Sequence, residues 1–133
     1  MKLDLPLSVK INRKTKSPRN ISLNLNTYRN LHYQISNQAK KIYKERIKEL
    51  IKGNKEVLTP PLSFSYILYP KTKRLTDIGN VMSIVQKFTE DALVELGVIE
   101  DDNYTIIQEI NYNFGYIDKD NPRVELTIKE MKR

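Results

Sequence analysis

The apolar residues of this 133-residue chain recur at two different spacings, and the change from one to the other limits the folds open to it. Apolar residues at every second position are typical of strands with one buried face. This alternation predicts strands or short extended segments over residues 3–11, 21–25, 62–69 and 123–131. We also predict a strand over residues 104–116, where polar residues interrupt the alternation.

Two further segments carry apolar residues three and four positions apart, which is the spacing of amphipathic helices. The first helix is predicted to begin at Asn26 or Thr27, either of which could cap it, and to end at Gly53. The second helix is predicted over residues 78–96, with Gly97 as its stop.

The predicted order of elements is therefore β-(β)-α-β-α-β-β. This order is typical of an α+β domain, here with a mixed sheet and two main helices. Both halves of the chain contribute strands and there is no internal repeat, so we predict a single domain over residues 1–133.

The composition excludes several kinds of site. Cysteine is absent and histidine occurs once, at His32, which rules out disulfides, thiolate zinc sites and His-rich metal sites. A bound metal ion would need oxygen ligands, as Mg²⁺, Mn²⁺ and Ca²⁺ do. There is no run of about 18 apolar residues and no apolar region typical of a signal peptide near Met1. We therefore expect no membrane span and a cytoplasmic location.

Charge is distributed unevenly along the chain, whose net charge is +7. Residues 1–75 hold 17 Lys and Arg against 4 Asp and Glu, a net charge of +13, whereas residues 76–133 hold 6 against 12, a net charge of −6. A basic half is typical of proteins that bind a polyanion such as nucleic acid. The alternative is a basic surface that contacts only solvent.

Three groups of basic residues are candidates for contacts with phosphate groups. The first two are predicted loops: Arg13, Lys14, Lys16 and Arg19, and then Lys71, Lys73 and Arg74. The third is a stripe of lysines four apart on the first helix: Lys40, Lys44, Lys48 and Lys52. For the stripe, the alternative is a solvated face on which Glu45 and Glu49 pair with nearby lysines.

Carboxylates lie at both ends of the second predicted helix. Asp77 and Asn80 are three apart at its start, so their oxygens lie on one face, while Asp101 and Asp102 follow its end. A helix of about 18 residues is roughly 27 Å long. The two ends can form one metal site only if the chain doubles back after Gly97 or if two chains contribute. The alternative is structural, with Asp77 as a helix cap and Asp101 and Asp102 in a turn.

An ordered set of motifs surrounds these carboxylates. It comprises Lys73-Arg74-Leu75-Thr76-Asp77-Ile78-Gly79-Asn80, then Asp91-Ala92-Leu93, then Leu96-Gly97-Val98-Ile99-Glu100-Asp101-Asp102-Asn103, and a closing segment over residues 123–131. The set resembles the RusA-type Holliday junction resolvases, which carry a basic run, Asp-x-Asp-Asn at a helix start, Asp-Ala-Leu, a glycine and paired aspartates. The resemblance covers about residues 62–131, and upstream Asn26-Thr27-Tyr28-Arg29 is similar to the family's Asn-x-Tyr-Arg.

The resemblance implies a homodimeric endodeoxyribonuclease, dependent on Mg²⁺ or Mn²⁺, that nicks four-way DNA junctions and is typically encoded by a phage or prophage. By position, Asp77 matches the family's first metal-binding aspartate and Asn80 its motif asparagine. Asp102 matches the later essential aspartate and Asp101 its neighbour. The resemblance thus implies catalytic roles for Asp77 and Asp102, and a metal site that also includes Asn80 and Asp101.

Two positions depart from the family pattern. Gly79 stands where the family has its second motif aspartate, and Ser83 stands where it has a catalytic lysine. Lys87 is one turn beyond Ser83 on the same helix face and is our candidate to replace that lysine, with Lys73 and Arg74 as alternatives. Asn80 or Glu100 are candidates for the missing oxygen ligand.

Three functions remain open at this point. The first is a metal-dependent junction endonuclease, and the second is a junction-binding protein of the same fold with weak or no nuclease activity. The third is a phage structural or interaction protein in which the motif has no catalytic role.

Overall fold

The computed structural model describes residues 1–54 and 56–132. In chain order its elements are β1 (Lys2–Leu5), β2 (Ser8–Ile11), β3 (Arg19–Ser22), α1 (Leu25–Arg29), α2 (Tyr33–Ile51), β4 (Leu62–Tyr69), α3 (Ile78–Glu95), β5 (Ile107–Phe114) and β6 (Arg123–Glu130).

The main sheet contains four strands in the order β1-β6-β4-β5, and β2 and β3 form a separate two-stranded hairpin. β6 is antiparallel to both β1 and β4, whereas β4 and β5 are parallel. Parallel neighbours need a long crossover connection, and α3 provides it. The predicted α+β class and mixed sheet are confirmed, and the two long helices α2 and α3 are accompanied by the short helix α1.

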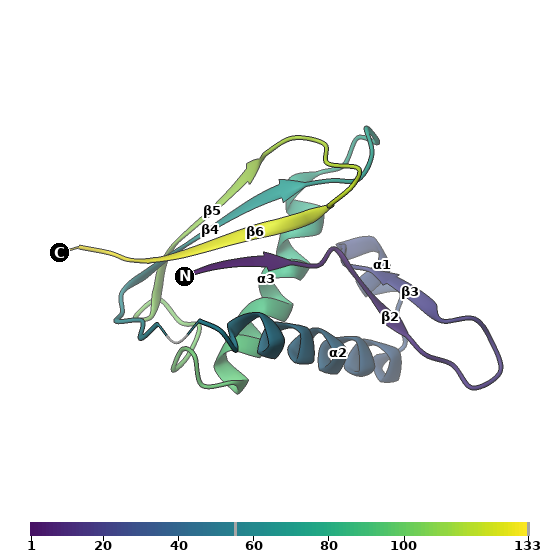
Figure 1. Cartoon of the computed structure of the whole chain (residues 1–133), viewed down its shortest axis with the longest axis horizontal. Coiled ribbons are helices and arrows are strands. Elements are labelled where there is room, and N and C mark those ends of the chain that lie inside the picture. The colour runs from purple at the N-terminus through teal and green to yellow at the C-terminus, as the bar shows by residue number, and fades with distance from the viewer. Residues whose placement is uncertain (55, 133) are drawn as a thin grey trace.

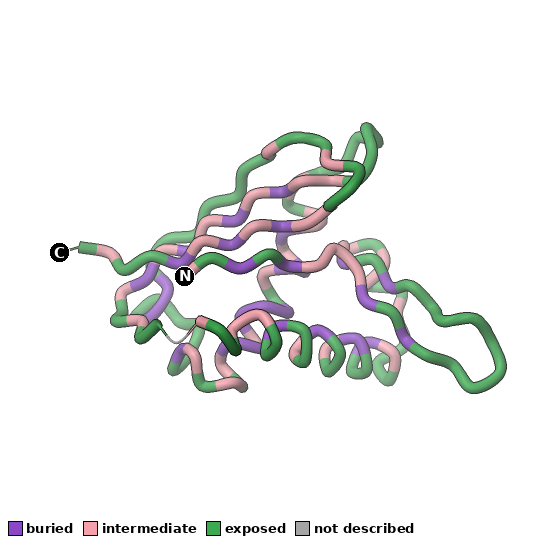
Figure 2. Tube along the Cα trace, in the orientation of Figure 1, coloured by how far each residue is buried: buried purple, intermediate pink, exposed green. Residues whose placement is uncertain are grey.

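The two long helices lie on the same side of the main sheet (Figure 1). Burial alternates along β4 and β6, as Figure 2 shows, with residues such as Phe64 and Leu126 fully buried. On α3, Val85 and Leu93 are also fully buried. The core therefore fills the space between one face of the sheet and the helices. No helix in the described part of the chain is long and apolar enough to cross a membrane.

The single strand predicted over residues 3–11 is wrong, because the structure divides it into β1 and β2. Pro6 lies just after β1 and has no N–H to donate to a strand ladder. β1 pairs with β6, while β2 pairs with β3, and the Leu7 carbonyl accepts a hydrogen bond from the Leu23 N–H at 2.9 Å. Alternation alone could not show that the chain leaves one sheet and enters another.

The first predicted helix is also divided. Asn24, and neither Asn26 nor Thr27, caps α1, and its side chain accepts the Thr27 N–H at 2.8 Å. His32 is in an extended conformation and starts α2 by accepting the Gln34 N–H on Nδ1. Polar side chains that bond to nearby backbone compete with helical hydrogen bonds, which explains two helices where apolar spacing predicted one.

The predicted stop of the second helix is confirmed at Gly97. Gly97 has φ 75°, a left-handed conformation that glycine adopts without strain. Its N–H donates a hydrogen bond to the Val94 carbonyl just after the end of α3. β5 is shorter than the predicted strand over residues 104–116. Asn103 forms a turn before it, accepting the Thr105 N–H on Oδ1 at 2.9 Å.

Candidate functional site

Asp77 occupies the N-cap position of α3, but its side chain makes no capping hydrogen bond. The residue is exposed, and the contact with the first turn is made by its backbone carbonyl, which accepts the Asn80 N–H at 3.1 Å. A carboxylate at a helix N-terminus is favoured by the helix dipole without this bond. The Asp77 oxygens are therefore free to contact a cation or an incoming ligand.

Asn80 has a structural partner instead. Its Oδ1 accepts a hydrogen bond from the backbone N–H of Leu25 at 3.1 Å, which ties the start of α1 to the first turn of α3. An amide oxygen that already accepts this bond is a weaker candidate for a metal ligand than the free Asp77 carboxylate. This contact does not support the prediction that Asn80 and Asp77 bind the same metal ion.

The two positions that depart from the family pattern differ in their surroundings. Gly79 is exposed, and a Cβ added there would meet no atom within 4 Å, so the helix has room for an aspartate beside Asp77. Ser83 is half-buried, and its Oγ is buried without a hydrogen-bond partner among the described residues. Lys87 is exposed on the same face, but it follows Asp77 by ten residues, which is about 15 Å along the helix.

The second acidic group, Asp101 and Asp102, lies in the turn after α3. The Asp101 carboxylate accepts the Asp102 N–H at 2.7 Å and Asn103 Nδ2 at 3.0 Å, and these bonds hold its pKa below the usual value. Asp102 is exposed beside a shallow hollow of about 230 Å³ that Asp91 and Glu95 also line. This is the local arrangement that the structural alternative expected, and of the two aspartates Asp102 has the freer carboxylate.

The two acidic groups do not meet within one chain. Asp77 lies at the start of α3, whereas Asp102 lines a hollow with Asp91 and Glu95 near its other end. The helix from Asp77 to Asp91 spans roughly 21 Å, and the chain runs back along α3 only in β5, after Asp102. No group of three or more Asp, Glu or His side chains that could hold a metal ion occurs within residues 1–54 and 56–132. A metal site that combines Asp77 with Asp102 therefore does not fit a single copy.

The predicted basic loops lie at one end of the domain. Arg13, Lys14 and Lys16 are exposed in the loop that joins β2 to β3, which extends away from the body of the protein in Figure 1, and Arg19 begins β3. The exposed residues Lys71, Lys73 and Arg74 join β4 to α3. A hollow of about 260 Å³, lined by Asn24, Pro70 and Thr76 among others, connects the base of the hairpin to this second loop. Asp77 follows the second loop directly.

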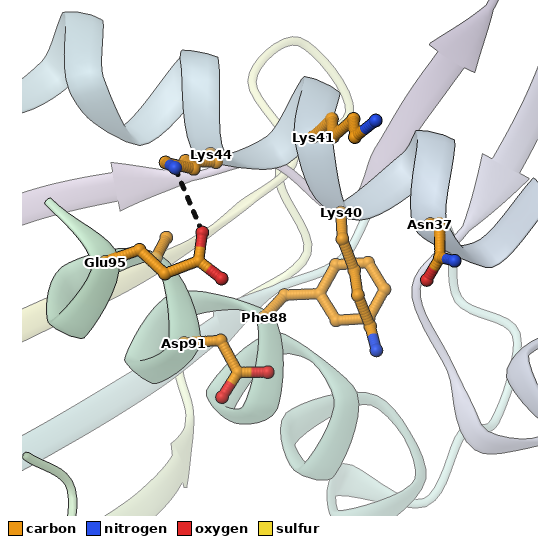
Figure 3. A pocket seen from close by; sticks show the side chains of 8 residues that line it. Asn37, Lys40, Lys41, Lys44, Phe88, Asp91 and Glu95 are labelled. Carbon is orange, nitrogen blue, oxygen red and sulfur yellow. Dashed lines mark ion pairs between the residues drawn. The ribbon is translucent and has the colours of Figure 1, made fainter.

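Two lysines of the stripe, Lys40 and Lys44, line a groove between α2 and α3 (Figure 3). Lys40 lies across the Phe88 ring, with Nζ 5.9 Å from its centroid and 5.6 Å from that of Tyr28. Lys44 pairs with Glu95 at 3.1 Å rather than with a glutamate of its own helix. The groove has a volume of about 320 Å³ and carries both signs of charge, so it has no clear preference for an anion.

Glu90 is a buried acidic residue that the sequence analysis missed. It is 6% exposed on α3, and Gln86 Nε2 donates to both of its carboxylate oxygens at 3.3 and 3.2 Å. Tyr112 of β5 in turn donates to the Gln86 side chain. Burial raises the pKa of Glu90 to about 7, Gln86 opposes this rise, and Asp102 and Asp91 add to it. The spacing of Gln86 and Glu90, four apart on a helix, was the available sequence signal.

This pKa predicts a pH dependence of stability. Because folded Glu90 holds its proton more tightly than the unfolded residue, its contribution is greatest below pH 4.5 and is lost as the pH rises to about 7. We expect the free energy of unfolding to fall by about 1–2 kcal/mol over this range, and Glu90→Gln to remove that fall. Urea unfolding at several pH values measures it. Exposed Glu100→Gln is the control, and an unchanged pH slope in Glu90→Gln would contradict the assignment.

Comparison with known proteins does not assign a function to these residues. No protein-family model and no curated protein matches the chain. The site must therefore be interpreted from its own geometry: a free carboxylate at Asp77, two neighbouring basic loops, and a second acidic group near the other end of α3.

Proposed function

We propose that this protein is a RusA-like endodeoxyribonuclease that binds four-way or otherwise branched DNA and cuts it with Mg²⁺ or Mn²⁺. The observation that carries the proposal is the position of Asp77, whose uncapped and exposed carboxylate directly follows a basic loop. A polyanion held by that loop would lie beside a motif carboxylate that makes no structural hydrogen bond.

The two basic loops, Arg13 to Arg19 and Lys71 to Arg74, contact the DNA backbone in this proposal. Lysine and arginine contacts to phosphate position DNA without selecting its sequence. Selection of a branched substrate then depends on the shape that the loops present, and binding weakens steeply as salt is added.

The active unit is a dimer in this proposal, since one copy does not bring Asp77 and Asp102 together. Two copies with their α3 helices antiparallel would place Asp77 of one beside Asp102 of the other. A metal ion held there would activate water and stabilise the charge of the cleaved phosphodiester. The residues of the chain supply the carboxylate charge and hold the DNA.

A second candidate is a junction-binding protein of the same fold that cuts weakly or not at all. Two observations favour it: Asn80 Oδ1 is engaged by the Leu25 N–H, and Gly79 provides no carboxylate. Both reduce the oxygen ligands near Asp77, and affinity for Mg²⁺ depends on such ligands.

A gel assay with synthetic four-way junctions, linear duplex of the same sequence, and buffers with and without Mg²⁺ tests both candidates. We expect the junction to be retained in preference to the duplex at low salt, and to be nicked only with the metal. Retention without nicking would favour the second candidate. Absence of junction-selective retention would rule out both and favour a structural or interaction protein.

Gly79→Asp distinguishes the two candidates further. The helix has room for this side chain, so we expect an increase in metal-dependent nicking of about tenfold or more, because it adds a carboxylate beside Asp77. The matched control is Gly79→Asn, which has the same shape without the charge. If wild-type nicking is near zero and Gly79→Asp restores it, the natural protein is the weakly cutting form. Equal rates for Gly79→Asp and Gly79→Asn would contradict a metal site at this helix end.

A further inference from the structure

A hollow of about 270 Å³ opens between the loop that follows β4 and the C-terminal end of β5. Its lining is mainly apolar and comes from Leu68, Leu75, Ile78, Phe114 and Ile117. Leu75 is 98% exposed, and Phe114 and Ile117 are 53% and 41% exposed. Large apolar side chains that face water around one hollow mark an interaction site more often than scattered residues do.

Backbone hydrogen bonds hold one wall of this hollow in place. The Gly115 N–H donates to the Leu68 carbonyl at 2.9 Å, and the Asp118 N–H donates to the Pro70 carbonyl at 2.8 Å. These bonds join the connection after β5 to the connection after β4, and the two lie side by side in Figure 1. Gly115 fits closely there, since an added Cβ would lie 2.5 Å from the Tyr69 ring. The wall is therefore formed before a ligand binds.

Arg123 supports the same wall from the other face of the sheet. Its guanidinium lies over the Tyr69 ring, 4.1 Å from the centroid, and donates to Asp118 Oδ2 at 2.8 Å. Both contacts fix the connection that carries Ile117. A surface that is ordered in advance loses less conformational entropy when a ligand binds.

The charge around the hollow is positive. Among the described residues that line it, the charged ones are Lys73 and Arg74, and neither takes part in an ion pair within residues 1–54 and 56–132. Asp118, in the connection after β5, already pairs with Arg123. The hollow thus combines an apolar lining with two free cations, which complements a ligand that carries an apolar group beside carboxylates.

The shape and position of the hollow favour a peptide as this ligand. Its volume is slightly below the roughly 300–1,000 Å³ of most small-molecule pockets, so it suits one or two side chains. DNA has no apolar side chain to fill it. β5 pairs only with β4 among the described strands, so its outer edge offers unpaired backbone groups to an extended chain beside Phe114.

We propose that this hollow binds an extended segment of another protein, in which one or two large apolar side chains adjoin a run of aspartates or glutamates. The apolar side chains fill the hollow, and the carboxylates pair with Lys73 and Arg74. The inference goes beyond the proposed function, which assigns the same two basic residues to DNA. The peptide and DNA would therefore compete for them.

A fluorescein-labelled peptide, Gly-Ser-Asp-Asp-Glu-Asp-Leu-Phe, tests the inference without DNA or metal. Fluorescence anisotropy with the full chain at low salt should show saturable binding with a dissociation constant at or below about 100 μM. One control peptide has Ser-Ser in place of Leu-Phe, and another has Asn and Gln in place of Asp and Glu. Each should bind about tenfold or more weakly. Absence of saturable binding, or equal binding of either control peptide, would overturn the inference.

Ile117→Ser tests the apolar lining. We expect it to weaken peptide binding about tenfold, because it removes an apolar side chain without adding a charge. Ile110→Ser is the matched control, since Ile110 is also 41% exposed but lies on β5 about 13 Å before Phe114 and does not line the hollow. Circular dichroism checks that both variants are folded. Equal weakening by the two variants would contradict the hollow as the site.

The variant that carries Lys73→Gln with Arg74→Gln tests the basic rim. It should bind the peptide about tenfold more weakly and lose much of the salt dependence. The control carries Arg13→Gln with Lys14→Gln, which removes the same charge from the exposed loop between β2 and β3. If both double variants weaken binding equally, the peptide responds only to net charge and the inference is wrong.

Junction retention separates this inference from the proposed function. Ile117→Ser keeps both rim cations, so it should retain a four-way junction as the wild type does while losing the peptide. Loss of the junction with unchanged peptide binding would assign the hollow to DNA and overturn the inference. Peptide binding by a protein that retains no junction would support the inference and rule out the proposed function.

Discussion

Asp77→Asn is expected to lower metal-dependent nicking of a four-way junction by about 100-fold or more. The substitution keeps the size of the side chain and removes the one motif carboxylate that is free of structural bonds at the start of α3. Single-turnover nicking with saturating enzyme measures the effect on the chemical step. Junction retention without metal should be unchanged or stronger, because a negative charge near the DNA has been removed.

The matched control for this experiment is Asp120→Asn, an exposed aspartate in the connection between β5 and β6. It removes the same charge from a loop to which the proposal gives no role, and nicking should change less than about twofold. If Asp77→Asn cuts as fast as Asp120→Asn, the metal assignment at the start of α3 is wrong. The junction-binding alternative then remains.

Phe88→Ala is expected to lower the free energy of unfolding by about 3–5 kcal/mol. Phe88 is 3% exposed, and its ring packs edge to face against Tyr28 at 5.9 Å and Tyr43 at 5.6 Å, with Lys40 across it. Removing the ring leaves a cavity at the contact of α1, α2 and α3. Urea unfolding followed by circular dichroism measures the loss of stability.

Phe114→Ala is the control for this core substitution. Phe114 is the same residue type at the edge of the sheet but is 53% exposed, so its loss should cost less than about 1 kcal/mol in the monomer. Equal destabilisation by the two substitutions would mean that the contact of the three helices does not carry the stability assigned to it.

The sequence predicts the fold class well because burial on one face leaves a clear period in the apolar residues. The alternation in β4 and β6 and the helical spacing in α3 correspond to single elements in the structure. The errors fall where a local backbone interaction overrides that period. Pro6 ends β1, and His32 starts a new helix by accepting the Gln34 N–H.

The candidate site could be predicted only in part. Asp77 is where the motif indicates, but its freedom from capping depends on a side-chain conformation that no spacing encodes. The position of Asn80 indicated a metal ligand, whereas its Oδ1 accepts a hydrogen bond from the N–H of Leu25, 55 residues earlier in the chain. Glu90 was missed for a similar reason, since its burial depends on the packing of α3 beside β5.

The distance between the acidic groups is the feature that most shapes the proposal. Asp102 lies beside Asp91, which is roughly 21 Å along α3 from Asp77, so a shared metal site requires two copies. Each copy would then contribute its first aspartate to one site and its later aspartate to the other. The two sites of the dimer would be identical and each would depend on both chains.

Mixing two inactive variants tests this claim most directly. Asp77→Asn and Asp102→Asn should each abolish junction nicking alone. In a mixture, half of the dimers would be heterodimers with one intact site, so nicking should recover to roughly a quarter of the wild-type rate. A mixture that stays as inactive as its components, although heterodimers are shown to form, would contradict a metal site shared between two copies.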